Sequence, residues 1–218
     1  MRSFPTLHVK PRAPARGFTP LYVGLASALL ASACSPAPPP KVAASGGPSQ
    51  GVVAKEILPP PGVVLESTCV STGPELCFDG IDNNCNGLLE EGCGIRSGSV
   101  QFVAAWAEAE ADVDLLVTDP SGELAKTEGG PTAGGLEKDR ECPGNDRRCR
   151  GQNLENVVLV EGIEPKLGTY RVVIRLDSTK GAALPIKVRV GARVGQRVYG
   201  LTVELGKPEE EKVIVFRL

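Results

Sequence analysis

Residues 169–176 read Thr-Tyr-Arg-Val-Val-Ile-Arg-Leu, and apolar side chains recur there at every second position. Successive side chains of a strand point to opposite faces, so Tyr170 and Leu176 lie on one face and Arg171 and Arg175 on the other. This alternation predicts a half-buried strand. The same pattern recurs over residues 100–106, 113–117, 186–190, 199–205 and 213–218. With turn signals between the stretches and no convincing amphipathic helix, residues 98–218 predict an all-β fold, an antiparallel β-sandwich of seven or eight strands.

The composition of the 218-residue chain excludes several classes of function. Hydrophobic residues make up 41% and charged residues 23%, which is ordinary for a folded protein. The only histidine is His8, in a segment expected to be removed, so no imidazole remains for Ser-His-Asp hydrolysis or for most zinc enzymes. The formal net charge is -2, and no basic patch is interleaved with aromatic residues, so no nucleic acid partner is expected.

The N-terminal segment, residues 1–33, has the features of an export signal. Its four basic residues precede an apolar run from Leu21 to Ala33 that is too short to span a bilayer comfortably. The run ends in Leu30-Ala-Ser-Ala-Cys34, which resembles a bacterial lipobox, although Ala31 stands where leucine is usual. The resemblance implies a lipoprotein signal peptide and a membrane anchor at lipidated Cys34. An ordinary secretory signal and a buried apolar helix are the alternatives.

Cleavage before Cys34 would leave an acidic protein at the cell envelope. Removing residues 1–33 lowers the count of Lys and Arg from 24 to 20 against 26 acids, which gives a net charge of -6. Ser35 is not the aspartate typical of inner-membrane retention, and by this analogy we expect an outer membrane lipoprotein. Residues 34–64 are rich in Pro, Ala and Gly and predict a disordered tether.

Six further cysteines, an even number in an exported chain, predict three disulfides. The first four are spaced eight residues apart and allow three pairings, whereas the last two flank a short loop and favour a local bridge. The six are Cys69, Cys77, Cys85, Cys93, Cys142 and Cys149.

Residues 65–97 combine the first four of these cysteines with acids that have no basic neighbours. Such uncompensated negative charge favours binding of a cation. From Glu66 to Cys93 there are six acids and no lysine or arginine. The stretch that begins at Asp82 resembles the spacing of a calcium loop, with glycine at position 6. Cys93 occupies position 12, where a bidentate glutamate belongs, so Glu90 or Glu91 would have to compensate. The predicted oxygen ligands at positions 1, 3, 5, 7 and 9 are Asp82, Asn84, Asn86, the Leu88 carbonyl and Glu90.

The run from Cys77 to Cys93, Cys-Phe-Asp-Gly-Ile-Asp-Asn-Asn-Cys-Asn-Gly-Leu-Leu-Glu-Glu-Gly-Cys, resembles the MopE-type metal-binding repeat. Asn84, Asn86 and Glu90 replace aspartates of the usual pattern, which lowers the charge of the site. The family is associated with copper, but copper prefers imidazole and softer ligands, so we expect calcium (Ca2+). The alternative is an acidic disulfide knot that binds no metal. The expected metal ligands are Asp79, Asp82, Asn84, Asn86, Leu88, Glu90 and Glu91.

The stretch Asp112-Val-Asp-Leu-Leu-Val-Thr-Asp-Pro-Ser-Gly122, with Gly134-Gly-Leu-Glu-Lys-Asp139, Glu155-Asn-Val and Gly168-Thr-Tyr-Arg-Val, resembles the YfaP-type β-sandwich of unknown function. The resemblance implies a fold and an exported setting. Its aspartates could form a second oxygen site, or Asp119-Pro-Ser-Gly could simply be a capped turn with solvated aspartates nearby. The candidate second-site ligands are Asp112, Asp114, Asp119, Asp139 and Glu155.

These features together predict a calcium-stabilised surface lipoprotein that is not an enzyme. Its sandwich would bind or scaffold an envelope protein or polysaccharide. A metal-capture protein that handles copper is one alternative, and a carboxylate-dependent hydrolase is another. The hydrolase is disfavoured because most aromatic residues of the mature chain are spaced so that they face the core. Few aromatic side chains then remain to stack on sugars. They are Phe78, Phe102, Trp106, Tyr170, Tyr199 and Phe216.

Overall fold

A computed structural model of the protein describes residues 51–66, 69, 71–143, 149 and 151–218. The described residues form nine strands and no helix. The strands are β1 (Glu56–Leu58), β2 (Val100–Trp106), β3 (Asp112–Thr118), β4 (Leu136–Glu141), β5 (Leu154–Leu159), β6 (Thr169–Ser178), β7 (Ile186–Val194), β8 (Arg197–Leu205) and β9 (Glu211–Arg217). None of the described residues lies in a helix long and apolar enough to cross a membrane.

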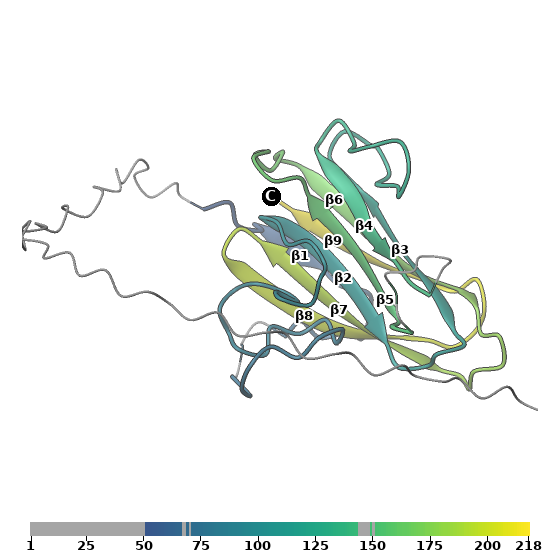
Figure 1. The fold of residues 1–218 in the computed structure, drawn as a ribbon. Helices are drawn as coiled ribbons and strands as arrows, with labels where there is room; N and C mark the ends of the chain where they lie inside the picture. The colour runs from purple at the N-terminus through teal and green to yellow at the C-terminus, as the bar shows by residue number, and fades with distance from the viewer. Residues whose placement is uncertain (1–50, 67–68, 70, 144–148, 150) are drawn as a thin grey trace, which may run out of the picture. The chain divides into compact units, whose positions relative to one another are not determined.

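The strands form two antiparallel sheets, which confirms the predicted all-β sandwich (Figure 1). One sheet has the order β1-β9-β6-β3 and the other β4-β5-β2-β7-β8. The alternating rows face each other between the sheets, and Tyr170, Phe102 and Phe216 are fully buried there. The ring centroids of Phe102 and Phe216 are 5.1 Å apart. Burial of these apolar rows is the main favourable contribution to folding.

The sequence prediction missed strands in both sheets. The predicted tether extended to Val64, but Glu56–Leu58 forms β1 and pairs with β9, so its C-terminal part belongs to the sandwich. Ile57 packs against the core, which explains why this short segment is ordered. The sequences of β4 and β5 show no clear alternation of polar and apolar residues, which is why both strands were missed. Residues 1–50, including the expected signal peptide, Cys34 and the first part of the tether, lie outside the described residues.

Residues 65–97, here called the stapled segment, pack on the outer face of the five-stranded sheet. Leu89 is fully buried and, with Ile95, joins outward-facing Val103, Ala105 and Leu154 in a second hydrophobic cluster. In Figure 1 the segment lies beside β7 and β8. The stapled segment is therefore a third layer whose order depends on the sheet beneath it as well as on its disulfides.

A glycine in β7 permits this close approach. A Cβ atom at Gly191 would lie 2.5 Å from the carbonyl oxygen of Gly80, which no real Cβ atom tolerates. Polar contacts fix the end of the segment: the buried side chains of Gln101 and Asn156 both donate to the Arg96 carbonyl, at 3.2 and 2.9 Å. The acidic loop is thus held against a rigid sheet, a suitable support for a ligand site.

Candidate metal site

Interleaved disulfides frame the acidic loop. Cys69 is bonded to Cys85 and Cys77 to Cys93, each pair 16 residues apart in the sequence. This is one of the three pairings that the sequence left open. The third bridge joins Cys142 to Cys149, as expected from their spacing. All three predicted disulfides are therefore present.

The loop from Asp82 to Leu88 is curled by its own side chains. The Asp82 carboxylate is buried and accepts hydrogen bonds from the backbone N–H groups of Asn86 (3.1 Å) and Gly87 (2.9 Å). The Asn84 side-chain oxygen accepts from the Asn86 N–H at 3.0 Å, and the Asn86 oxygen accepts from the Leu88 N–H at 2.8 Å. Gly87 has φ +83°, which supplies the sharp turn predicted at position 6.

Glu91 closes the open side of this loop. Its Oε1 atom accepts hydrogen bonds from the side-chain amides of Asn84 (2.5 Å) and Asn86 (2.6 Å). Its Oε2 atom is buried and has no hydrogen-bond partner among the described residues. A buried carboxylate oxygen without a donor is costly unless a cation or water satisfies it. The side chains of Asp82, Asn84, Asn86 and Glu91 therefore surround one small region, and the orphaned oxygen belongs to it.

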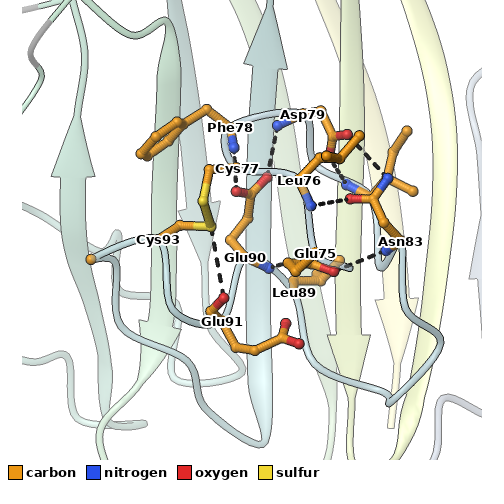
Figure 2. Close-up of a disulfide and its surroundings, with 12 residues drawn as sticks. Glu75, Leu76, Cys77, Phe78, Asp79, Asn83, Leu89, Glu90, Glu91 and Cys93 are labelled. Carbon is orange, nitrogen blue, oxygen red and sulfur yellow. Dashed lines mark hydrogen bonds between the residues drawn. A yellow bond between two sulfur atoms is a disulfide. The ribbon is translucent and has the colours of Figure 1, made fainter. Parts of the chain in front are cut away.

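Glu90 does not join these ligands, contrary to the sequence prediction. Its fully buried carboxylate turns toward a backbone turn and accepts from the N–H groups of Phe78, Asp79 (2.8 Å) and Gly80 (2.6 Å). Figure 2 shows the Glu90 carboxylate directed to this turn, whereas the Glu91 side chain extends away from it. Burial raises the pKa of Glu90, although the backbone donors favour the ionised form. Glu90 is therefore a structural residue that holds two parts of the stapled segment together.

Asp79 is also bound within the segment. It accepts from the Ile81 N–H at 2.9 Å and from the Asn83 side-chain amide at 3.2 Å, so it caps a turn. Glu75, which the sequence analysis did not single out, accepts from the N–H groups of Asn83 and Glu90, both at 3.0 Å (Figure 2). Burial raises the pKa of Glu75. The acids of the segment thus divide into internal caps and loop ligands.

The remaining candidate ligands are all hard oxygen donors. They come from two carboxylates, two amides and the Leu88 carbonyl, which accepts no hydrogen bond from the described residues. Neither Asp82 nor Glu91 forms an ion pair with a lysine or arginine in the described part of the chain. Calcium prefers such hard oxygen ligands in flexible geometry. The six cysteines of this part of the chain are in disulfides and offer no thiolate to a softer metal.

The five residues predicted for a second metal site do not come together. Asp112 pairs with Lys180 at 2.9 Å and Asp114 with Arg175 at 2.6 Å, both on the four-stranded sheet. Asp119 caps its own turn, accepting from the N–H of Ser121 at 2.7 Å. Its burial opposes ionisation, but its hydrogen bonds outweigh that cost and lower its pKa. The capped turn that was the alternative therefore accounts for Asp119.

Asp139 and Glu155 also have separate roles. Asp139 accepts from the Arg96 N–H at 3.0 Å and helps anchor the stapled segment. Glu155 faces the interior, accepts from the Leu115 N–H at 2.5 Å and pairs with Lys138 at 2.9 Å. Lys138 and Glu155 are 5% and 2% exposed, so this is a buried ion pair. The five residues predicted for a second metal site therefore do not form one site.

Sequence reasoning missed one acidic cluster. One carboxylate oxygen from each of Asp114, Glu141 and Glu155 lies within 4.8 Å of the others. The Lys138 ammonium is 2.9 Å from Glu155 and 3.5 Å from Glu141, and Arg175 neutralises Asp114. Burial raises the pKa of Glu155 to about 8 even though Lys138 acts in the opposite direction. Because two side chains already supply the positive charge, this trio is a poor candidate for a metal.

A pocket of about 400 Å³ adjoins the loop. One wall comes from the loop itself and its disulfide, and the other from the turn between β7 and β8 and the start of β8. Its lining residues are Cys69, Asp82, Cys85, Asn86, Gly87, Gln196, Arg197, Val198 and Tyr199.

Comparison with known proteins found no matching family model, no similar curated protein and no similar solved structure. The case for a function therefore depends on the residues and geometry of the chain itself.

Proposed function

We propose that this protein is a lipid-anchored component of the cell envelope that binds calcium through the loop from Asp82 to Glu91. The β-sandwich acts as a non-catalytic scaffold that presents this loop to a partner. One observation carries the proposal: the buried Glu91 Oε2 has no hydrogen-bond partner among the described residues, beside a ring of oxygen-bearing side chains. A bound cation satisfies that oxygen and offsets the charge of Asp82 and Glu91.

The composition of the loop favours weak binding. Only two of its side-chain ligands are charged, because Asn84 and Asn86 occupy positions 3 and 5. Fewer charged ligands weaken calcium binding, and extracellular modules with such sites work at about 0.1 to 1 mM. An affinity in this range suits a protein exposed outside the cytoplasm, where calcium is abundant enough to occupy the site.

The bound ion has a structural role in this proposal. Leu89 lies within the loop, between the Leu88 carbonyl and Glu91, and its buried side chain anchors the stapled segment on the five-stranded sheet. Fixing Asp82 and Glu91 on one ion would hold both ends of the loop around that anchor. Calcium therefore stabilises the third layer of the fold together with the two disulfides.

The first test is thermal unfolding of the oxidised full chain in detergent, in 5 mM calcium (about five times the upper end of that affinity range) and in chelator. A ligand that binds only the folded state raises the melting temperature. Calcium should raise it for the wild type and have little effect on Asp82→Ala or Glu91→Gln. Asp112→Asn is the matched control, because that carboxylate pairs with Lys180 on the other sheet and should keep the calcium response. A wild-type protein with the same melting temperature in both buffers would refute the calcium site.

The anchor is tested separately with Cys34→Ser. The wild-type protein should incorporate labelled fatty acid and sediment with membranes, whereas the variant should lose the label and remain in the soluble fraction. A wild-type protein that carries no label and does not sediment would exclude lipidation.

A further inference from the structure

The pocket beside the loop shares two residues with the proposed calcium site. Asp82 and Asn86 line the pocket and are also loop ligands. A calcium ion bound there would therefore lie close to the wall of this pocket. Calcium takes six to eight oxygens, and the loop supplies four side chains and one carbonyl, so oxygens of water or ligand complete its shell.

The opposite wall carries a free positive charge. Arg197 begins β8, is exposed and lines the pocket. It makes no ion pair or side-chain hydrogen bond with any residue that the structure describes. Arginine binds carboxylates with two parallel hydrogen bonds, which makes it a specific receptor for that group.

Calcium would reverse the summed charge of the two loop carboxylates and Arg197. The carboxylates of Asp82 and Glu91 and the guanidinium of Arg197 sum to -1. A calcium ion adds two positive charges and changes the sum to +1. The region without the ion therefore repels an anion, and the region with the ion attracts one.

From these features we infer that the pocket binds a uronic acid unit of an acidic polysaccharide, and does so only when calcium is bound. The carboxylate pairs with Arg197, and the sugar hydroxyls meet the ion and the side-chain amides of Asn86 and Gln196. The pocket volume of about 400 Å³ lies within the ordinary range for small-ligand sites. This inference depends on the proposed calcium function and names the partner class of the same site.

Calcium and the sugar should strengthen each other's binding. Thermodynamic linkage requires that a ligand whose affinity rises with calcium raises the affinity for calcium by the same factor. Uronate should thus lower the calcium concentration at which the melting temperature rises. Galactose, which has the same ring without the carboxylate, should not.

The test uses isothermal titration calorimetry on the full chain in detergent, with D-galacturonate and digalacturonate as probes. All solutions are dialysed against the same free calcium concentration, so that calcium binding by the sugar does not contribute. We expect binding in calcium, none in chelator and none with galactose. Arg197→Gln should weaken binding about tenfold or more, the effect of losing one charged hydrogen-bonding partner. Arg171→Gln is the control, because Arg171 is exposed on the other sheet.

The possible results separate a failure of uronate binding from a failure of the calcium site. If calcium raises the melting temperature but the uronates do not bind, or bind equally well to the Arg197→Gln protein, this inference is wrong and the calcium function stands. Uronate binding that persists in chelator also refutes it, because the charge reversal would then be unnecessary. If calcium does not raise the melting temperature of the wild type, the proposed function itself fails.

Discussion

Two acidic regions of this molecule differ in what balances their charge. The loop from Asp82 to Glu91 brings two carboxylates together without a lysine or arginine among the described residues, and one of their oxygens is buried without a donor. The cluster of Asp114, Glu141 and Glu155 has more carboxylates, but the Lys138 ammonium lies among them. The first region therefore invites an external cation, and the second already contains one.

The comparison shows that the number of clustered acids is a poor guide to metal binding. Asp114, Glu141 and Glu155 place three carboxylate oxygens within 4.8 Å of one another, yet Arg175 and Lys138 supply positive charge to them. In the loop, amide oxygens take the place of further carboxylates, so the ligand set is less charged but has no competing cation. A better guide to metal binding is whether the carboxylates already have positively charged partners and whether any of their oxygens lacks a hydrogen-bond donor.

Replacing Lys138, the cation within the second acidic cluster, should have the largest effect on the free energy of unfolding. Lys138→Met leaves the Glu155 carboxylate buried without its ion-pair partner, and loss of one partner of a buried pair costs about 3–5 kcal/mol. Denaturant unfolding of the oxidised protein above about pH 8, where Glu155 is ionised, measures this free energy. Lys187→Met is the control, because Lys187 and Glu204 are 67% and 59% exposed and such pairs contribute about 1 kcal/mol or less. Equal losses for the two variants would mean that Lys138 does not neutralise a buried charge.

Packing beneath the loop provides the second test. Leu89 is fully buried between the stapled segment and the five-stranded sheet, and its replacement by alanine should cost about 2–4 kcal/mol. The same variant should weaken calcium binding, because the loop loses its support. Leu76→Ala is the control, since Leu76 lies in the same segment but is 56% exposed. If Leu89→Ala unfolds like the wild type, the segment is held by its disulfides alone.

The buried Glu155 should also make the stability of the protein depend on pH. Glu155 has a folded-state pKa of about 8 and an ordinary value of 4.5, so the folded protein binds one more proton between these values. This stabilisation is complete below about pH 4.5 and is lost as the pH rises through about 8. The free energy of unfolding should fall by up to about 1.4 kcal/mol per pH unit in this window. Glu155→Gln should flatten the slope, as measured by urea unfolding at several pH values; an unchanged slope would assign it to other groups.

The smallest expected effect is a change in calcium affinity when one charge is added to the loop. Asn84→Asp adds a carboxylate next to Glu91. It should tighten calcium binding about fivefold, or about 1 kcal/mol, because affinity rises with the number of charged ligands. Without calcium the same variant should melt at a lower temperature, since the added charge repels Glu91. Calorimetric titration and thermal unfolding in chelator check both expectations. Weaker calcium binding by the variant would contradict the assigned ligand positions.

Much of the fold could be predicted from local patterns. Tyr170, Val172, Ile174 and Leu176 all face the core as their alternation requires, because a strand has a strict period of two. Two strands, β4 at the edge of the five-stranded sheet and β5 beside it, were missed because most residues on both of their faces are buried and their sequences do not alternate. The short strand β1 was taken for tether because only its pairing with β9 orders it.

The candidate site was predicted in part. The spacing correctly grouped Asp82, Asn84 and Asn86, because a short loop with Gly87 at its turn can curl only within a narrow range. It could not decide between Glu90 and Glu91. That choice depends on three backbone N–H groups, of Phe78, Asp79 and Gly80, that donate to the Glu90 carboxylate, and these groups lie outside the loop.

The sequence by itself determined the sandwich, the number of disulfides and the loop spacing that brings Asp82, Asn84 and Asn86 together. These properties follow from spacing, which acts between near neighbours along the chain. Only the tertiary structure decided that the first four cysteines pair in an interleaved manner and that the stapled segment packs on the sheet. It also decided that Lys138 and Arg175 neutralise the second group of acids. Residues far apart in the sequence make these contacts, and both burial and charge balance depend on which of them meet.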